Sequence, residues 1–108
     1  SLHDALPISP RYMPLESFSK TTPADPSRDI FSLGVIAYTM MYGSSPFGAV
    51  TIPQIVTALK KREPPFNRFD GDDDSLLIDL VREMISRDPS QRPTARDLFD
   101  RVTEMMHN

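Results

Sequence analysis

The chain of 108 residues contains no cysteine. This absence excludes a disulfide framework, a thiolate nucleophile and a cysteine-ligated zinc site. A large excess of one charge is also missing, because 12 Lys and Arg stand against 15 Asp and Glu, for a formal net charge of −3. A mildly acidic chain with scattered basic residues has no electrostatic footprint for nucleic acid or an anionic membrane surface. We therefore expect no nucleic-acid partner.

The sequence also shows no pattern typical of a membrane span or a metal site. The longest apolar-rich run, residues 30–42, is well short of the roughly 20 apolar residues that a spanning helix needs. The two histidines, His3 and His107, lie at opposite ends of the chain, so neither has a partner for a catalytic pair. The acidic run 70–74 alternates like a calcium loop, but the glycine and glutamate of that motif are absent. We expect no membrane segment, no metal site and no catalytic residue in this chain.

The first eight residues differ in character from the rest. Their sequence, SLHDALPI, lacks the basic start, apolar stretch and small-residue cleavage site of a secretory signal. It resembles the in-frame translation of a short-read sequencing adapter. We therefore interpret residues 1–8 as an artefact and expect the natural sequence to begin at about Ser9, with one unit over residues 9–108.

The rest of the chain is predicted to hold four helices and no strand. Five of the 11 prolines fall in the first 26 residues, so residues 10–26 should form a loop with one short turn. Residues 29–42 are apolar on every side, the pattern of a helix surrounded by protein. Amphipathic helices with capping pairs or a single apolar stripe are predicted over 51–61, 76–85 and 94–106.

Three segments of the sequence, taken together and in their order, resemble those of a known family. They are residues 9–16 (SPRYMPLE), 29–34 (DIFSLG) and 87–94 (RDPSQRPT), with SPF at 45–47 after the apolar helix. Together they resemble the second half of the large lobe of a eukaryotic-type (Hanks-type) protein kinase, from the end of the activation segment to the last helix. The resemblance extends from Ser9 to about Met106. It implies a mainly α fold, a four-helix fragment of the large lobe with no complete sheet.

The resemblance places four residues in structural motifs of the family and implies a role for three of them. Glu16 matches the glutamate of the family's Ala-Pro-Glu motif, and Arg92 matches the arginine that pairs with it; a guanidinium and a carboxylate can form a bidentate pair. The alternative is two unrelated surface charges. Asp29, in one motif with Gly34, matches the buried aspartate that holds the catalytic loop. Its alternative is a helix N-cap, and both roles can coexist.

Further residues match positions around the substrates. Ser9, Pro10 and Tyr12 fall on the shelf that receives the substrate residue just after the phosphoacceptor. Ile36 and Met40 fall where the family anchors the hydrophobic stack beneath the adenine. These roles are implied by the resemblance alone.

The chain departs from the family pattern at several positions. Phe31 replaces the usual tryptophan, Pro14 and Leu15 replace Ala-Pro, and Thr39 replaces a glutamate with which many kinases grip an arginine upstream of the target. The Cys-Trp pair usual in tyrosine kinases is absent from residues 76–85, which favours serine/threonine specificity. Residues 25–34 are also similar to the bacterial branch of the family.

The parts that perform phosphoryl transfer are missing from the sequence. It contains no Gly-x-Gly-x-x-Gly, no His-Arg-Asp and no Asp-Phe-Gly, which the family needs to hold phosphates, base and magnesium. The resemblance implies a parent that uses ATP and Mg to phosphorylate Ser or Thr of proteins, in the cytoplasm or at the cytoplasmic side of a membrane. This chain would be inactive, would bind no cofactor, and would have the missing N-terminal part of the kinase domain as its partner. The alternative is a pseudokinase remnant or a helical protein-interaction module.

Overall fold

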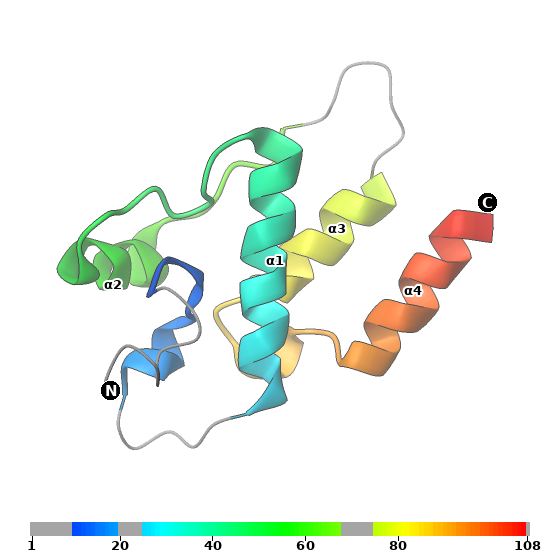
Figure 1. The fold of residues 1–108 in the computed structure, drawn as a ribbon, viewed down its shortest axis with the longest axis horizontal. Coiled ribbons are helices and arrows are strands. Elements are labelled where there is room, and N and C mark those ends of the chain that lie inside the picture. The colour runs from blue at the N-terminus through cyan, green and yellow to red at the C-terminus, as the bar shows by residue number, and fades with distance from the viewer. Residues whose placement is uncertain (1–9, 20–24, 68–74, 108) are drawn as a thin grey trace, which may run out of the picture.

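The computed structural model describes residues 10–19, 25–67 and 75–107 (Figure 1). Over these ranges the chain forms helices and no strand, so the mainly α class is confirmed. The α-helices are α1 (Pro26–Tyr42), α2 (Ile52–Lys61), α3 (Ser75–Met84) and α4 (Ala95–His107), and the 3-10 helices are η2 (Pro10–Tyr12), η3 (Leu15–Phe18) and η4 (Pro89–Gln91). No helix in these ranges has the length and apolarity to cross a membrane. The expectations for residues 1–8, Ser9 and the acidic run 70–74 lie outside the described residues.

The start of α1 corrects the sequence analysis in two ways. The helix begins at Pro26, in its first turn, where the missing proline N–H costs nothing. Asp25 is the N-cap, because its carboxylate accepts the backbone N–H of Ser27 at 2.7 Å. The N-cap alternative for Asp29 is therefore wrong, and Asp29 lies in the first turn of the helix. At the other end, Gly43 ends α1 in the left-handed conformation, with φ of 75°.

The proline-rich segment before α1 is more ordered than the expected loop with one turn. It contains two 3-10 helices, η2 and η3, separated by Met13 and Pro14. Proline at position 10 or 14 stands at the beginning of each turn, where its fixed φ suits the bend and no amide donor is needed. Short i to i+3 turns therefore tolerate a proline spacing that excludes a long helix.

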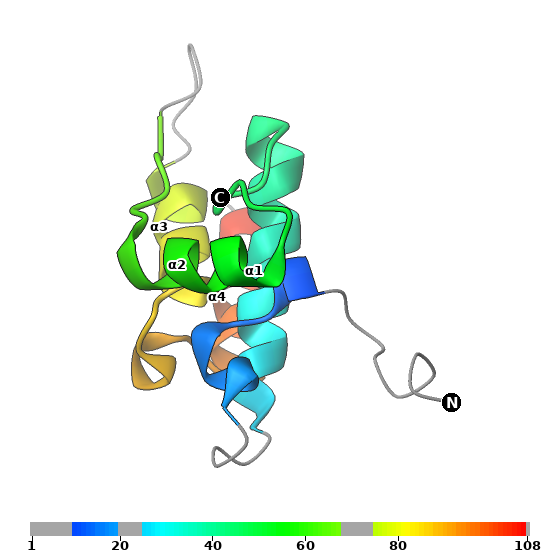
Figure 2. The ribbon, with the colours of Figure 1, turned by 90° about the vertical axis from the view of Figure 1, so that its left-hand side faces the viewer.

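The helices are arranged around α1. Figures 1 and 2 show α3 and α4 on one side of α1, and α2 with the segment 10–19 on the other. The main buried cluster joins α1, α2 and α3 through Phe31, Val35, Tyr38, Phe47, Ile55, Leu59, Val81 and Ile85. A second cluster of Ile30, Leu80 and Met84 takes in Leu98 and Met105 of α4. The segment 10–19 packs against the first cluster through Tyr12, Leu15 and Phe18.

Gly34 sets the close approach of α1 to α3. A Cβ atom at this position would lie 2.7 Å from Met84 Cβ and 2.8 Å from Ile85 Cγ2, closer than real Cβ contacts allow. Only a residue without a side chain fits while the two helices keep this separation. The glycine of the DIFSLG motif therefore has a packing reason that is visible within this chain.

One face of α1 is left uncovered by the other helices. The sequence predicts a helix surrounded by protein, and residues such as Phe31 and Tyr38 are indeed buried. However, Leu33, Ile36 and Met40 are 49%, 44% and 81% exposed. Their spacing of three and four residues places them on one side of the helix. We call these three residues the α1 stripe.

Candidate functional site

The site begins with an ion pair between two segments that lie 76 positions apart in the sequence. Arg92 Nη1 lies 2.5 Å from Glu16 Oε2, and Nη2 lies 3.1 Å from Oε1. The pair is bidentate, and the exposed fraction is 0% for the Arg92 side chain and 14% for Glu16. The contact expected between these residues is therefore confirmed, and the alternative of two unrelated surface charges is wrong. A fork-to-fork pair of this kind fixes both the distance and the orientation of the segments that carry it.

Arg92 also contacts two segments besides that of Glu16, which are α1 and the loop before α4. Its Nε donates to the Ser86 carbonyl at 2.8 Å, and its Nη atoms lie 3.4 Å from the Ser27 carbonyl and 3.3 Å from the Arg87 carbonyl. The guanidinium carbon stands 4.9 Å from the centroid of the Phe31 ring. These acceptors and the ring face compensate the cost of burying a positive charge. Arg92 thus joins the segment 10–19, α1 and the loop before α4.

The charge state of Glu16 follows from this surrounding. Burial raises the pKa of the Glu16 carboxyl, but the Arg92 hydrogen bonds, a backbone hydrogen bond and the charges of Arg92 and Arg28 together outweigh it. The pKa therefore lies below the ordinary value of 4.5. Glu16 is ionised at neutral pH and holds Arg92 as a full ion pair.

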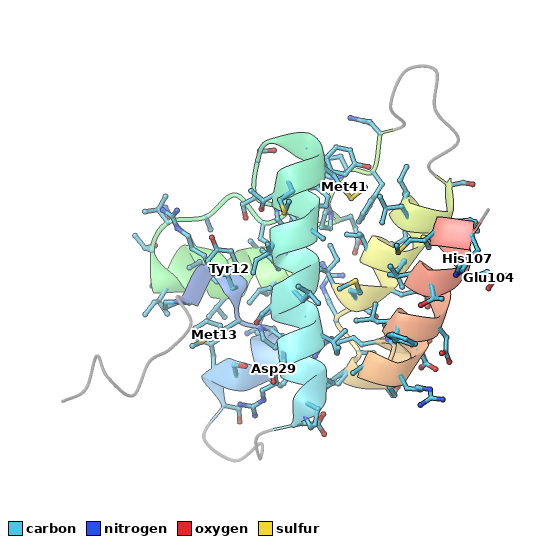
Figure 3. All side chains as sticks on the ribbon, turned by 45° about the vertical axis from the view of Figure 1, so that its right-hand side comes forward. Tyr12, Met13, Asp29, Met41, Glu104 and His107 are labelled. Atoms are coloured by element: carbon cyan, nitrogen blue, oxygen red, sulfur yellow. The ribbon has the colours of Figure 1, made fainter. Side chains whose placement is uncertain are left out.

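The residues matched to a substrate shelf precede Glu16 in the sequence by a few positions. Pro10 and Tyr12 are the first and last residues of η2, whereas Ser9 lies outside the described residues. Tyr12 is half-buried against the main cluster, and Ser32 of α1 donates a hydrogen bond of 2.6 Å to its carbonyl. Figure 3 shows Tyr12 beside α1, with Asp29 at the first turn of that helix. We call residues 10–12 the shelf.

The residues matched to the catalytic loop and the adenine stack lie on the open face of α1. Asp29 is exposed, one turn before the α1 stripe. Ile36 and Met40 belong to that stripe and point away from the two buried clusters. The structure thus gathers the three residues on one face, while their functional roles stay predictions.

Arg87, in the loop that follows α3, binds the C-terminal end of α2. Its Nε donates to the Leu59 carbonyl and its Nη2 to the Arg62 carbonyl, each at 2.6 Å, while Nη1 binds the Glu63 carboxylate at 2.5 Å. Two of these acceptors are carbonyls at the C-terminal end of α2, which have no partner within that helix. Arg87 therefore caps α2 from across the fold.

Comparisons with known proteins complete this description. The family model of the protein kinase domain matches residues 3–102. The chain belongs to the protein kinase domain family. It is 36% identical over 74 residues to the cell cycle serine/threonine-protein kinase CDC5/MSD2 of Saccharomyces cerevisiae, covering 68% of this chain and 10% of the relative. It is also 36% identical over 93 residues to calcium-dependent protein kinase 9 of Oryza sativa, covering 85% of this chain and 16% of the relative.

A third relative fits the same picture. Calcium/calmodulin-dependent protein kinase type I of Schizosaccharomyces pombe is 31% identical over 91 residues, covering 82% of this chain and 27% of the relative. This kinase-family chain therefore spans between 10% and 27% of the length of these three relatives. They are fungal and plant proteins, so they lend no support to the similarity with the bacterial branch.

The low pKa of Glu16 predicts how stability depends on pH. A carboxyl whose pKa is lowered by folding stabilises the fold above its unfolded value of 4.5, and that contribution is lost as the pH falls through the folded pKa. A Glu16→Gln variant lacks the contribution at every pH. In urea unfolding of the full-length protein, the gap in unfolding free energy between wild type and Glu16→Gln should therefore shrink from about pH 6 to about pH 3. A gap that stays constant would contradict the assigned charge state.

The close contact at Gly34 predicts a loss of stability on adding one methyl group. Gly34→Ala should lower the free energy of unfolding by about 1–2 kcal/mol, because overpacking against Met84 and Ile85 outweighs the gain in helix propensity. Met106→Ala, at a position of α4 that is 80% exposed, should stay within about 0.5 kcal/mol. Urea unfolding followed by circular dichroism measures both. A stabilised Gly34→Ala variant would show that α1 and α3 can separate freely.

Proposed function

We propose that this chain forms the lower half of the large lobe of a serine/threonine-protein kinase. In that whole protein, the γ-phosphoryl group of ATP is transferred to a Ser or Thr hydroxyl of a protein substrate. The chain contributes the scaffold beneath the active site and part of the peptide shelf. The observation that carries this proposal is the buried Glu16–Arg92 pair, because it joins the two motifs through which the chain resembles the family.

The residues present do not fit ATP and magnesium. Among the described residues, no three Asp, Glu or His side chains gather to hold a metal ion. The sequence also has no glycine-rich loop whose backbone amides could cradle phosphates. When bound, ATP supplies the phosphoryl group and magnesium neutralises its charge. We assign both to parts of the kinase domain outside this chain, and the residues here act by supporting and orienting.

The open face of α1 supports the proposal that other parts of the kinase domain hold ATP and magnesium while this chain supports them. The α1 stripe is apolar and exposed, and Asp29 supplies a carboxylate at one end of it. An exposed apolar surface of this kind favours coverage by another part of the protein. We infer that the catalytic loop and the N-terminal part of the kinase domain cover it, with Asp29 accepting hydrogen bonds from backbone amides of that loop and Ile36 and Met40 supporting the adenine stack.

The proposal is tested by comparing the 108-residue chain with the full-length protein. We expect the chain alone to bind no ATP in calorimetry and to bind an apolar dye through the α1 stripe. The double variant Ile36→Ser and Met40→Ser should lower that dye signal severalfold, whereas Val50→Ser, an exposed residue outside α1, should leave it unchanged. Micromolar ATP affinity of the chain alone would contradict the proposal.

The full-length protein supplies the decisive activity measurement. It should transfer phosphate from ATP to a general protein substrate, and phosphoamino-acid analysis should find phosphoserine or phosphothreonine. Transfer to tyrosine alone would overturn the assigned specificity. If no transfer occurs because the upstream catalytic or magnesium-binding aspartate is replaced, the pseudokinase alternative holds; if the upstream sequence encodes no kinase parts, the helical interaction module holds.

A further inference from the structure

A buried hydroxyl connects α1 to the shelf. Ser32 is 7% exposed, and its Oγ lies 2.6 Å from the Tyr12 carbonyl and 3.1 Å from the Arg28 carbonyl of its own helix. Serine inside a helix commonly bonds back to the carbonyl four residues earlier. Here the shorter contact runs to a residue 20 positions away. Because a hydroxyl has a single proton, Ser32 chiefly serves the shelf.

The position of Ser32 on the helix gives this hydrogen bond a particular place. Ser32 follows Asp29 by three residues, which turns it about 60° around the helix from the line of Asp29 and the α1 stripe. It therefore lies at the border between the buried side of α1 and its open face. The carbonyl that it binds ends η2, the turn that forms the shelf. One hydrogen bond thus fixes the shelf to α1 at Ser32, next to the open face of the helix.

We propose that Ser32 is a positioning residue for the protein substrate. Its hydroxyl holds the Tyr12 carbonyl, and through it sets the height of the shelf on which the substrate residue after the phosphoacceptor rests. Ser32 itself contacts no substrate. The inference rests on the proposed function, because the shelf has a substrate only if the whole protein is a kinase.

Other contacts keep the fold intact when this hydrogen bond is lost. The Tyr12 side chain remains against the main cluster, and Glu16 remains bound to Arg92. Removing the hydroxyl leaves the Tyr12 carbonyl without its donor, so the turn moves to find another partner. The consequence expected is a displaced and more mobile shelf on an otherwise folded protein.

The first measurement is amide hydrogen exchange in the full-length protein. Ser32→Ala should speed exchange of the Met13 amide, which closes η2 by donating to the Pro10 carbonyl at 3.2 Å, by about tenfold. Ser32→Thr keeps the hydroxyl and should leave exchange near wild type, while Ser32→Cys, a weak donor, should fall between the two. The matched control is Thr39→Val, which removes a hydroxyl of the same helix that donates within α1, to the Val35 carbonyl at 2.8 Å. It should leave the Met13 amide unchanged.

The second measurement is steady-state kinetics with peptide substrates. Ser32→Ala should raise the KM for peptide about fivefold to tenfold and leave the KM for ATP unchanged, and Ser32→Thr should restore both. For two peptides that differ only in the residue after the phosphoacceptor, the ratio of their kcat/KM values should also move closer to one. An equal rise in both KM values would overturn the inference in favour of general destabilisation.

The two measurements separate this inference from the proposed function. If Ser32→Ala leaves exchange of the Met13 amide unchanged, the inference fails whatever the kinetics show. If exchange increases but the full-length protein phosphorylates nothing, the hydrogen bond is confirmed as a tether and the kinase proposal fails, together with the substrate role given to Ser32.

Discussion

Replacing Arg92 by alanine is expected to lower the free energy of unfolding by about 3–5 kcal/mol, the usual cost of leaving one partner of a buried ion pair uncompensated. The Arg92 side chain is fully buried, and its loss leaves the Glu16 carboxylate without its ion-pair partner and the Ser86 carbonyl without the Arg92 donor. Urea unfolding of the full-length protein measures the change. We expect proteolytic cleavage within residues 10–19 to accelerate first, because that segment loses its link to the loop before α4.

Two controls determine whether the pair itself is responsible. Arg96→Ala removes an arginine whose contact with Asp100, at 3.7 Å, is exposed on α4, and it should change stability by no more than about 0.5 kcal/mol. A double-mutant cycle with Glu16→Gln and Arg92→Ala should give a coupling energy of at least about 1 kcal/mol. Strictly additive losses would mean that the two residues stabilise the fold independently of each other.

Replacing Phe31 by alanine should cost a similar amount, about 3–5 kcal/mol, for a different reason. Phe31 is 1% exposed, stacks on Phe47 with ring centroids 5.8 Å apart, and lies beneath the Arg92 guanidinium. Its truncation opens a cavity in the main cluster and removes the ring face that helps to compensate the buried charge. Urea unfolding of the full-length protein again provides the value.

The same substitution on the surface provides the control for Phe31. Phe99 of α4 is largely exposed, so Phe99→Ala should cost at most about 1 kcal/mol. Equal losses at the two positions would show that the main cluster can repack around the missing ring. Because Phe31 and Arg92 are in contact, their combined variant should lose less stability than the sum of the two single losses.

The helices could be predicted from the sequence because local chemistry determines where they begin. The reciprocal hydrogen bonds of Thr51 and Gln54 form as the capping pattern predicts, and Thr94 and Asp97 repeat the arrangement before α4. The start predicted at residue 29 is too late for α1, because proline breaks a helix interior but suits the first turn. Asp25 followed by Pro26 is equally a pattern for an N-cap and first turn.

The contacts between distant segments were only partly accessible from the sequence. The Glu16–Arg92 pair was predicted through the resemblance, since nothing in the spacing of two charges 76 positions apart indicates that they meet. The hydrogen bond from Ser32, the stacking of Arg92 on Phe31 and the capping of α2 by Arg87 were missed. They depend on where helices pack, and the one local signal is a serine next to Phe31 in a mostly apolar helix.

The short loop before α4 supports two regions at once. From residues 86–92, Arg87 reaches the C-terminal end of α2 and Arg92 reaches Glu16 behind the shelf. Both connections are made by guanidinium groups that bind several acceptors in fixed directions. A change in this loop is therefore transmitted to α2 and the shelf together. A ligand, modification or substitution that displaced residues 86–92 would shift both regions as one body, even though it touched neither of them.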